Sequence, residues 1–336
     1  MSIKKRKEDH IKTALDERMQ YSEKNLLEDV ILLHNSLPEL DIKEVDATYK
    51  FLGKTLSAPM MITAVTGGFE EAGEINRKLA EACEKHRIAF GLGSQRAMLE
   101  DRNMKKTYYV KDVAPSIPVV GNIGAYQLKG YSVKQIEDMV DEIEVDALAV
   151  HLNPLQESIQ PEGDKNWKGV LSKIEELVMD ASFPVIVKET GAGINFSVAW
   201  QLKEAGVEWV DVSGKGGTSW SRMEYARGGR PEGFEEWGIP TALSILMCKG
   251  VVKVIASGGI RSGVDGAKAV ALGAEIFGGA YPFLKALHEK KLDEEIEKWK
   301  MQFRNVLFLT GSENIATFKR RRYFIKGELK ELAGQM

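Results

Sequence analysis

Four polar side chains that could take part in chemistry fall within seven residues of the chain. They are His151, Asn153, Gln156 and Glu157. The imidazole and the two amides can donate or accept hydrogen bonds, and the carboxylate can bind a hard cation such as Mg²⁺. A polar loop after a strand has the same composition, so this motif alone does not decide between a binding site and an ordinary surface turn.

The residues before this motif predict a strand that carries it to one end of a barrel. Residues 146–150 are an apolar run typical of a buried strand. Side chains alternate between the two faces of a strand, and here one face is small at its base and polar at its tip. That face carries Ala147, Ala149, His151 and Asn153. Pro154 cannot donate an N–H and is expected to end the strand pairing, which leaves Gln156 and Glu157 in the following loop.

Eight short apolar runs alternate with helical segments along the chain. The predicted strands are residues 60–63, 88–91, 118–122, 146–150, 184–188, 209–213, 252–257 and 275–278. The predicted helices between them are residues 71–85, 133–143, 167–180, 197–205, 240–249 and 264–272. This alternation indicates a parallel sheet, and eight strands with right-handed crossovers close as a (β/α)₈ TIM barrel. A doubly wound sheet is the alternative, but it calls for an acidic residue after the second strand, where the chain has Ser94-Gln95-Arg96.

The predicted strands divide the chain into three parts. Residues 1–57 form an N-terminal extension, with a helix-like stretch to about Tyr21, that is expected to fold over the barrel mouth. Residues 58–290 form the barrel. Residues 291–336 form a helical tail of the same domain.

The composition is that of a globular protein without an obvious nucleic-acid or membrane partner. The chain has 336 residues, of which 43% are hydrophobic, and a net charge of −3. It lacks an overall basic excess, and the basic run at residues 319–322 has no interleaved aromatic side chains. No apolar run is long enough to span a membrane, and the N-terminus lacks the apolar core of a secretory signal. Cys83 and Cys248 are expected to be buried thiols. These features predict a cytoplasmic protein.

The predicted strand ends are polar where the strand bodies are apolar. In (β/α)₈ barrels the active site lies at the carboxyl ends of the strands. The seventh and eighth ends, residues 257–263 and 277–280, resemble the phosphate cradle of barrels that bind flavin mononucleotide (FMN). In such a cradle, backbone N–H groups and a helix N-terminus face a phosphate. Lys188 ends the fifth strand on the same face as Ile186, the predicted lumen face, where a cation would stabilise the anionic reduced flavin.

Motifs spanning residues 6 to about 284 together resemble the type II isopentenyl-diphosphate isomerases, which need reduced FMN for a reaction without net redox change. The matching motifs are Arg6-Lys7-Glu8-Asp9-His10-Ile11, Thr66-Gly67-Gly68, Gly93-Ser94-Gln95-Arg96-Ala97, Gly121-Asn122-Ile123-Gly124, His151-Leu152-Asn153-Pro154-Leu155-Gln156-Glu157, Val187-Lys188-Glu189, Gly216-Gly217-Thr218-Ser219-Trp220 and Ser257-Gly258-Gly259-Ile260-Arg261. Related flavin barrels lack the combination of the fifth motif with the Arg6-Lys7 pair. Val65 stands where the family usually has Met, and Lys111 where Arg is common.

The resemblance implies an isomerase that interconverts isopentenyl and dimethylallyl diphosphate by adding and removing a proton, with reduced FMN as acid and base. The implied diphosphate ligands are Arg6, Lys7, His10, Ser94, Gln95, Arg96 and Gln156. Glu157 would hold Mg²⁺ against the diphosphate. The implied catalytic residues are His151, Asn153 and Gln156, and the Gln156 amide would orient the substrate rather than relay a proton.

The resemblance also implies how the cofactors are bound. FMN would be held by Ala64, Val65, Thr66, Ser94, Asn122, Lys188, Ser213, Thr218, Gly259, Ile260, Arg261, Ala280 and Tyr281. NADPH or NADH would reduce the flavin at the same mouth, since no dinucleotide-binding fold is visible. The implied assembly is a homo-oligomer, a tetramer or an octamer.

Two other classes compete with this interpretation. A flavin oxidoreductase of the 2-hydroxy-acid oxidase or dihydroorotate dehydrogenase type needs a residue that takes the substrate proton, commonly a His with an Arg, or a Ser or Cys in a mobile loop. Of the five histidines, only His151 falls at a strand end, without such a partner nearby in sequence. A non-catalytic FMN or phosphate barrel would need neither Glu157 nor the Arg6-Lys7 pair.

Overall fold

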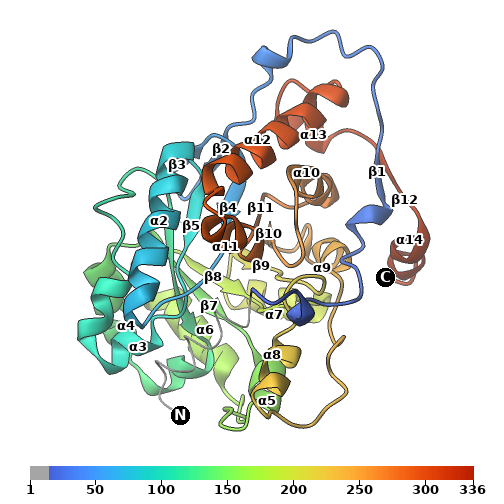
Figure 1. Ribbon diagram of the computed structural model, residues 1–336. Helices are drawn as coiled ribbons and strands as arrows, with labels where there is room; N and C mark the ends of the chain where they lie inside the picture. Colours follow the sequence, from blue (N-terminus) through green and yellow to red (C-terminus); the bar gives the residue numbers. More distant parts are fainter. Residues whose placement is uncertain (1–14) are drawn as a thin grey trace.

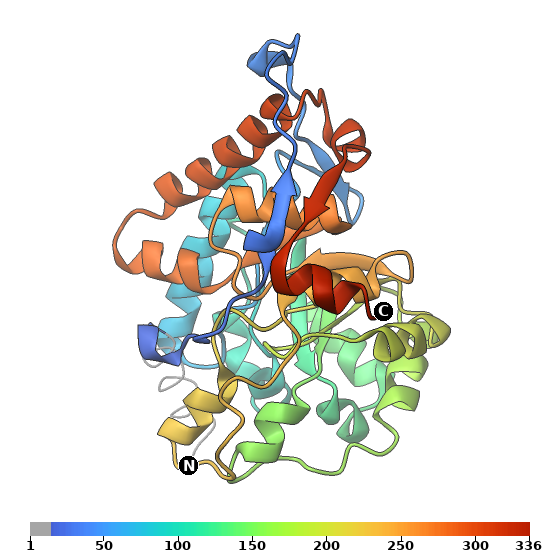
Figure 2. The ribbon, with the colours of Figure 1, turned by 90° about the vertical axis from the view of Figure 1, so that its right-hand side faces the viewer.

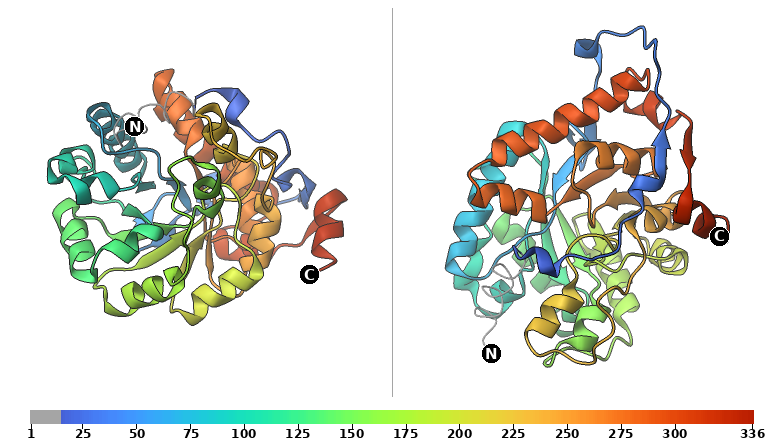
Figure 3. Two further views of the ribbon diagram at one scale, coloured as in Figure 1. Left: turned by 90° about the horizontal axis from the view of Figure 1, so that it is seen from below. Right: turned by 45° about the vertical axis from the view of Figure 1, so that its right-hand side comes forward.

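Eight parallel strands close into a barrel in the computed structural model, which describes residues 15–336. The barrel strands are β4 (Met60–Ile62), β5 (Ala89–Gly91), β6 (Val119–Gly124), β7 (Ala147–His151), β8 (Val185–Lys188), β9 (Trp209–Asp211), β10 (Lys253–Ala256) and β11 (Ile276–Gly279). Each strand pairs with the next one in sequence, and β11 returns to β4. The ring of strands inside a ring of helices is visible in Figures 1 and 3. The predicted (β/α)₈ barrel is confirmed, and the doubly wound alternative is wrong.

Amphipathic helices cover the outside of the barrel. They are α2 (Glu70–His86), α4 (Val133–Ile143), α6 (Val170–Asp180), α7 (Phe196–Glu204), α9 (Thr241–Cys248), α10 (Gly263–Leu272) and α11 (Tyr281–His288). The start of α4 is marked in the sequence, because Ser132 and Gln135 form a capping box there. Its buried residues, Ile136, Met139, Val140 and Ile143, follow the helical period and face the core. The two cysteines are buried free thiols in α2 and α9, as predicted.

The two faces of the barrel strands contribute to two different apolar clusters. Leu148 and Val150 belong to the layer between the strands and the helices, whereas Ala147, Ala149 and Ile186 belong to the barrel interior. This alternation is the one predicted for β7 and β8. The polar ends of the interior faces therefore point into the barrel mouth.

A hairpin from the N-terminal extension packs against the opposite, amino-terminal end of the barrel. It consists of β2 (Tyr49–Phe51) and β3 (Lys54–Leu56), and Phe51 and Leu56 join the interior cluster. The Phe51 ring lies edge-on to Trp209, the first residue of β9, with the ring centroids 5.0 Å apart. The sequence did not predict this hairpin.

A strand from the N-terminal extension pairs with a strand from the C-terminal tail on one side of the molecule. Strand β1 (Val30–Leu32) pairs antiparallel with β12 (Tyr323–Ile325), and the two lie side by side in Figure 2. Helices α12 (Leu292–Leu309), α13 (Ile315–Lys319) and α14 (Gly327–Ala333) complete the tail. The tail is mainly helical, as predicted. The short strand β12 was not predicted; there Tyr323, Phe324 and Ile325 favour a strand and find a partner about 290 residues away in sequence.

The segment before β1, residues 15–27, is here called the strap. It contains the short turn η1 (Glu17–Met19) and is extended at Gln20, and Leu26 near its end has a φ of +63°. The predicted helix to Tyr21 is therefore wrong within the described residues. Shorter elements elsewhere are η2 (Leu27–Asp29), η3 (Ile42–Glu44), α3 (Arg96–Glu100), η4 (Arg102–Thr107), η5 (Tyr126–Gly130), α5 (Pro154–Ile159) and α8 (Trp220–Ala226). None of the helices within residues 15–336 has the length and apolar character needed to cross a membrane.

Candidate active site

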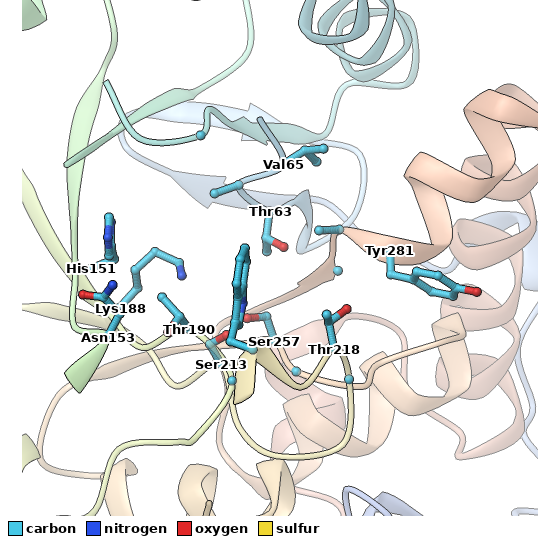
Figure 4. A pocket seen from close by; sticks show the side chains of 18 of the residues that line it. Thr63, Val65, His151, Asn153, Lys188, Thr190, Ser213, Thr218, Ser257 and Tyr281 are labelled. Carbon is cyan, nitrogen blue, oxygen red and sulfur yellow. The ribbon is translucent and has the colours of Figure 1, made fainter. Parts of the chain in front are cut away.

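A cavity of about 290 Å³ opens at the carboxyl ends of the barrel strands. Figure 4 labels ten of the residues that line it, which lie at or follow the ends of β4, β7, β8, β9, β10 and β11. The predicted site residues that line it are Ala64, Val65, Thr66, Ser94, Arg96, Asn122, His151, Asn153, Gln156, Glu157, Lys188, Ser213, Thr218, Gly259, Ile260, Arg261, Ala280 and Tyr281. The structure therefore brings eighteen predicted residues to one place. Their individual roles stay predictions.

Of the predicted site residues within residues 15–336, only Gln95 does not line the cavity. Arg6, Lys7 and His10 lie outside the described residues. Gln95 is fully buried, and its amide donates to the Gly93 carbonyl at 2.7 Å and accepts from the Asn122 backbone N–H. Gln95 therefore braces the ends of β5 and β6 and has no polar group turned to a ligand.

The opening motif lies partly on a helix rather than in a loop. Pro154 occupies the first turn of α5, where its missing N–H needs no partner. The residue that was predicted to end the strand pairing therefore starts a helix. Gln156 and Glu157 are thus held on a helical turn, and the prediction that they sit in a loop was wrong. His151 Nδ1 lies 2.8 Å from Asn122 Oδ1, which fixes the orientation of the imidazole ring.

The Glu157 carboxylate is nearly buried and accepts three hydrogen bonds from uncharged groups. Its partners are the Asn153 side-chain amide at 2.9 Å, the Asp164 backbone N–H at 2.7 Å and the Gln160 side-chain amide at 3.5 Å. No basic side chain forms an ion pair with it among residues 15–336. Nor does the described part of the chain contain a cluster of three or more His, Cys, Asp or Glu placed to hold a metal. A cation at this carboxylate would need its other ligands from substrate and water, as Mg²⁺ commonly does.

A buried acidic residue that the sequence did not identify holds Gln156. The Gln156 amide donates to Glu224 at 2.7 Å, and Glu224 also accepts from Arg227. Arg227 in turn contacts Glu162 at 2.8 Å. Glu224 lies on α8, which packs against α5, and it is completely buried. Gln156 is thereby fixed with its carbonyl oxygen near Asn153, at 3.2 Å from the side-chain nitrogen.

Lys188 is buried at the end of β8 beside two acidic residues. Asp211 is its partner in the register with β9, so both side chains start from neighbouring positions on the interior face. Asp211 also accepts from Ser257 Oγ at 2.6 Å. Burial lowers the pKa of Lys188, and the charges of Asp211 and Glu189 oppose that shift. Burial raises the pKa of Asp211, and Lys188 opposes that shift in turn.

Glu189 gives the folded protein a pH-dependent stability. Burial raises its pKa to about 7, although three backbone N–H groups and Lys188 favour the carboxylate. Since the pKa is higher in the folded than in the unfolded chain, the bound proton stabilises the fold below about pH 4.5, and this stabilisation is lost as the pH rises to about 7.

We expect the free energy of unfolding of wild-type apoprotein, relative to Glu189→Gln, to fall by up to about 3 kcal/mol between pH 5 and pH 8. Chemical denaturation of both proteins across this range measures the difference, in which all shared titrating groups cancel. A difference that stayed constant with pH would contradict the assignment.

Two glycines shape the cradle after β10. Gly258 and Gly259 have φ angles of +97° and +73°, in the region that favours glycine. A Cβ atom at either position would collide with the backbone oxygen of Gly214 or Gly216. On the other side, α11 begins at Tyr281 directly after Gly279 and Ala280. The Tyr281 hydroxyl is buried without a hydrogen-bond partner among the described residues, which suits a site that receives an anionic group.

Several cavity residues were not predicted as ligands. They are Gln20, Thr63, Gly67, Gly93, Gln127, Gln160, Thr190, Gly191, Gly214, Gly217, Trp220, Ser257, Gly258, Gly279, Pro282 and Leu284. Most are neighbours of predicted residues and could have been found from the strand ends. Gln20 could not, because it belongs to the strap.

The barrel, the glycine cradle and the buried lysine define a class, the FMN-dependent barrel enzymes. In agreement, the model of the family described as FMN-dependent dehydrogenase matches residues 132–324, more than half of the chain. Solved structures confirm the fold alone. A mandelate oxidase mutant with a monooxide FMN adduct superposes with a TM-score of 0.66 at 16% identity, covering 95% of this chain and 92% of that one. A flavocytochrome b2 variant with sulfite bound gives 0.68 at 20% identity, covering 96% and 81%.

Within this class, the sequence relatives are more specific. The isopentenyl-diphosphate delta-isomerase of Archaeoglobus fulgidus is 45% identical over 340 residues, covering 98% of each chain. Those of Pyrococcus horikoshii and Rickettsia africae are each 44% identical, covering 97% and 92% of this chain and 93% and 94% of theirs. The chain belongs to the isopentenyl-diphosphate delta-isomerase family. The predicted family and its enzyme class, an isomerase, are confirmed.

Proposed function

We propose that the cavity binds FMN together with isopentenyl or dimethylallyl diphosphate and interconverts the two. The observation that carries this proposal is the juxtaposition of a phosphate cradle, a buried lysine and the His151–Glu157 motif in one cavity. The cradle suits the FMN phosphate. The motif supplies the polar groups for a second, metal-bound phosphate ligand. Both groups lie in a chain whose relatives are named for this substrate.

The residues of the chain divide into two groups around the cofactor. FMN would be held by the carboxyl ends of β4, β5, β6, β8 and β9 and by the cradle, through Ala64, Val65, Thr66, Ser94, Asn122, Lys188, Ser213, Thr218, Gly259, Ile260, Arg261, Ala280 and Tyr281. Lys188 would lie against the flavin as its cationic partner. When bound in reduced form, FMN would supply the acid and the base for moving the double bond. The apolar barrel interior beneath the cavity keeps this region at a low dielectric constant, where the buried charge of Lys188 acts strongly.

The diphosphate would bind at the side of the cavity formed by α5. Arg96 and Ser94 would contact its oxygens, and Arg6, Lys7 and His10 of the N-terminal extension would add charge. Mg²⁺ would neutralise the repulsion between the diphosphate and Glu157. Gln156, oriented by Glu224, and Asn153 would position the five-carbon alkene with His151. We also propose NADPH or NADH as the reductant, action in the cytoplasm and a homo-oligomeric assembly.

A flavin oxidoreductase is the competing function, because the structural neighbours share the fold with flavin oxidases. The sequence relatives favour an isomerase, since they are named isopentenyl-diphosphate delta-isomerase.

Substrate turnover against reductant consumption tests the proposal. We expect isopentenyl diphosphate to be converted with many turnovers after a single two-electron reduction of each FMN. Stoichiometric use of reductant would identify an oxidoreductase instead. A mixture without reductant, in air, is the control and should show no conversion.

A further inference from the structure

The strap brings a side chain to the cavity from outside the barrel. Gln20 lines the cavity together with Thr218 and Arg261. Its amide nitrogen donates to Thr218 Oγ1 at 3.1 Å, and its amide oxygen accepts from Arg261 Nη2 at 3.1 Å. The reverse amide orientation would set its NH₂ group against the guanidinium, where only donors meet. Gln20 is therefore fixed with one bond to each side of the cradle.

These two bonds direct the donors of Thr218 and Arg261. A threonine hydroxyl that accepts from an amide keeps its own O–H free to donate elsewhere. The Arg261 guanidinium, with one N–H on Gln20, has further N–H groups available and lies over the Tyr281 ring at 5.6 Å from its centroid. Both donors border the cradle, and neither bond to Gln20 uses up the capacity that a phosphate needs.

The backbone of the strap is joined to the same loop. Gln20 forms an antiparallel bridge with Thr218, flanked by bonds from the Tyr21 N–H to the Gly217 carbonyl and from the Ser219 N–H to the Met19 carbonyl, each 2.8 Å. Farther along the strap, the Asn25 side chain donates to the Gly259 carbonyl at 2.6 Å. The strap thus touches both the loop after β9 and the glycine turn after β10.

We propose that Gln20 is a positioning residue of the FMN phosphate site and links cofactor binding to the seating of the strap. This inference rests on the proposed function, because it takes FMN as the occupant of the cradle. A ligand that fixes Thr218 and Arg261 stabilises the partners of the strap, so by linkage the seated strap raises the affinity for FMN by the same factor.

The test compares FMN with riboflavin, which lacks the phosphate, on wild-type apoprotein and on Gln20→Ala. We expect the loss of one neutral hydrogen bond, to Thr218, and one charge-assisted hydrogen bond, from Arg261, to weaken FMN binding about 5- to 30-fold and to leave riboflavin binding unchanged. Gln20→Glu should weaken FMN at least as much, since a carboxylate cannot donate to Thr218 and repels phosphate. Lys24→Gln is the matched control, because it removes an exposed contact of the same strap with Glu28, at 3.3 Å, and neither residue lines the cavity.

Trypsin cleavage after Arg18, whose side chain is largely exposed, reports the seating of the strap. Saturating FMN should slow the appearance of the fragment that begins at Met19 in wild type, and much less in Gln20→Ala. Equal FMN affinity of wild type and Gln20→Ala would overturn the inference, as would an equal loss of riboflavin affinity, which marks a merely structural role. A wild-type protein that bound neither flavin would instead contradict the proposed function and, with it, this inference.

Discussion

Lys188→Ala is expected to bind FMN at least ten times more weakly than wild type and to make the bound flavin harder to reduce. The lysine is the buried cation at the end of β8, and reduction adds negative charge to the flavin beside it. A hydrogen bond to a charged group contributes about 1.5–3 kcal/mol, which corresponds to a fall of roughly 30–60 mV in a two-electron potential. Fluorescence titration gives the affinity, and a redox titration of the complex gives the potential.

Removing Lys188 also leaves Asp211 and Glu189 buried without their cation, so the variant is expected to lose stability as well. Two further variants separate this effect from the effect on the flavin. Lys188→Arg keeps the positive charge and should keep most of the potential. Lys111→Ala removes a buried lysine that pairs with Asp146 at 2.7 Å, just before β7 and so at the opposite end of the barrel. Lys111→Ala should lower the stability of the protein and leave the reduction potential of the flavin unchanged. A Lys188→Ala potential equal to that of wild type would show that the lysine does not face the flavin.

The sequence predicted the barrel well because each unit is a local pattern. Strand β7 and helix α4 were found within one residue of their observed bounds, since an apolar run or a capping box depends on neighbours in sequence. The carboxyl ends of such strands meet at one edge by topology, so the strand order alone brought Thr66, Lys188 and Arg261 into one cavity. The alternation of side chains along a strand also predicted that Lys188 lies on the interior face of β8.

The features that were missed depend on contacts between distant segments. Glu224 reads in sequence as an ordinary acidic residue on a short helix, and its bond to Gln156 joins positions 68 residues apart. Strand β12 exists because β1 pairs with it, and the hairpin β2–β3 because the barrel interior receives Phe51. Gln20 bridges 198 residues to Thr218. No periodic pattern in the sequence indicates any of these contacts, because each depends on how distant segments pack in the folded protein.

Glu157→Gln is expected to be nearly inactive at saturating substrate while it still binds FMN. Glu157 is the buried carboxylate of the α5 turn, and its three partners are uncharged donors that leave its negative charge uncompensated. A diphosphate brought to this carboxylate without a cation between them would be repelled. Mg²⁺ shared by Glu157 and the phosphate oxygens removes that conflict, so the variant should need much more Mg²⁺ and reach a lower maximal rate. A Mg²⁺ titration of the activity, after treatment with a chelator, measures both quantities.

The hydrogen bond from the Asp164 N–H to Glu157 raises a structural alternative, in which the carboxylate only holds the loop after α5. Ser158→Ala is the matched control, because it changes the exposed residue next to Glu157 on α5, whose hydroxyl donates to the Leu155 carbonyl at 2.7 Å and which does not line the cavity. We expect its Mg²⁺ titration to follow that of wild type. If Glu157 were only a loop anchor, Glu157→Gln would lose thermal stability, but its Mg²⁺ titration curve would superimpose on that of wild type. Such a curve would remove Glu157 from the metal site and leave the ion to substrate and water alone.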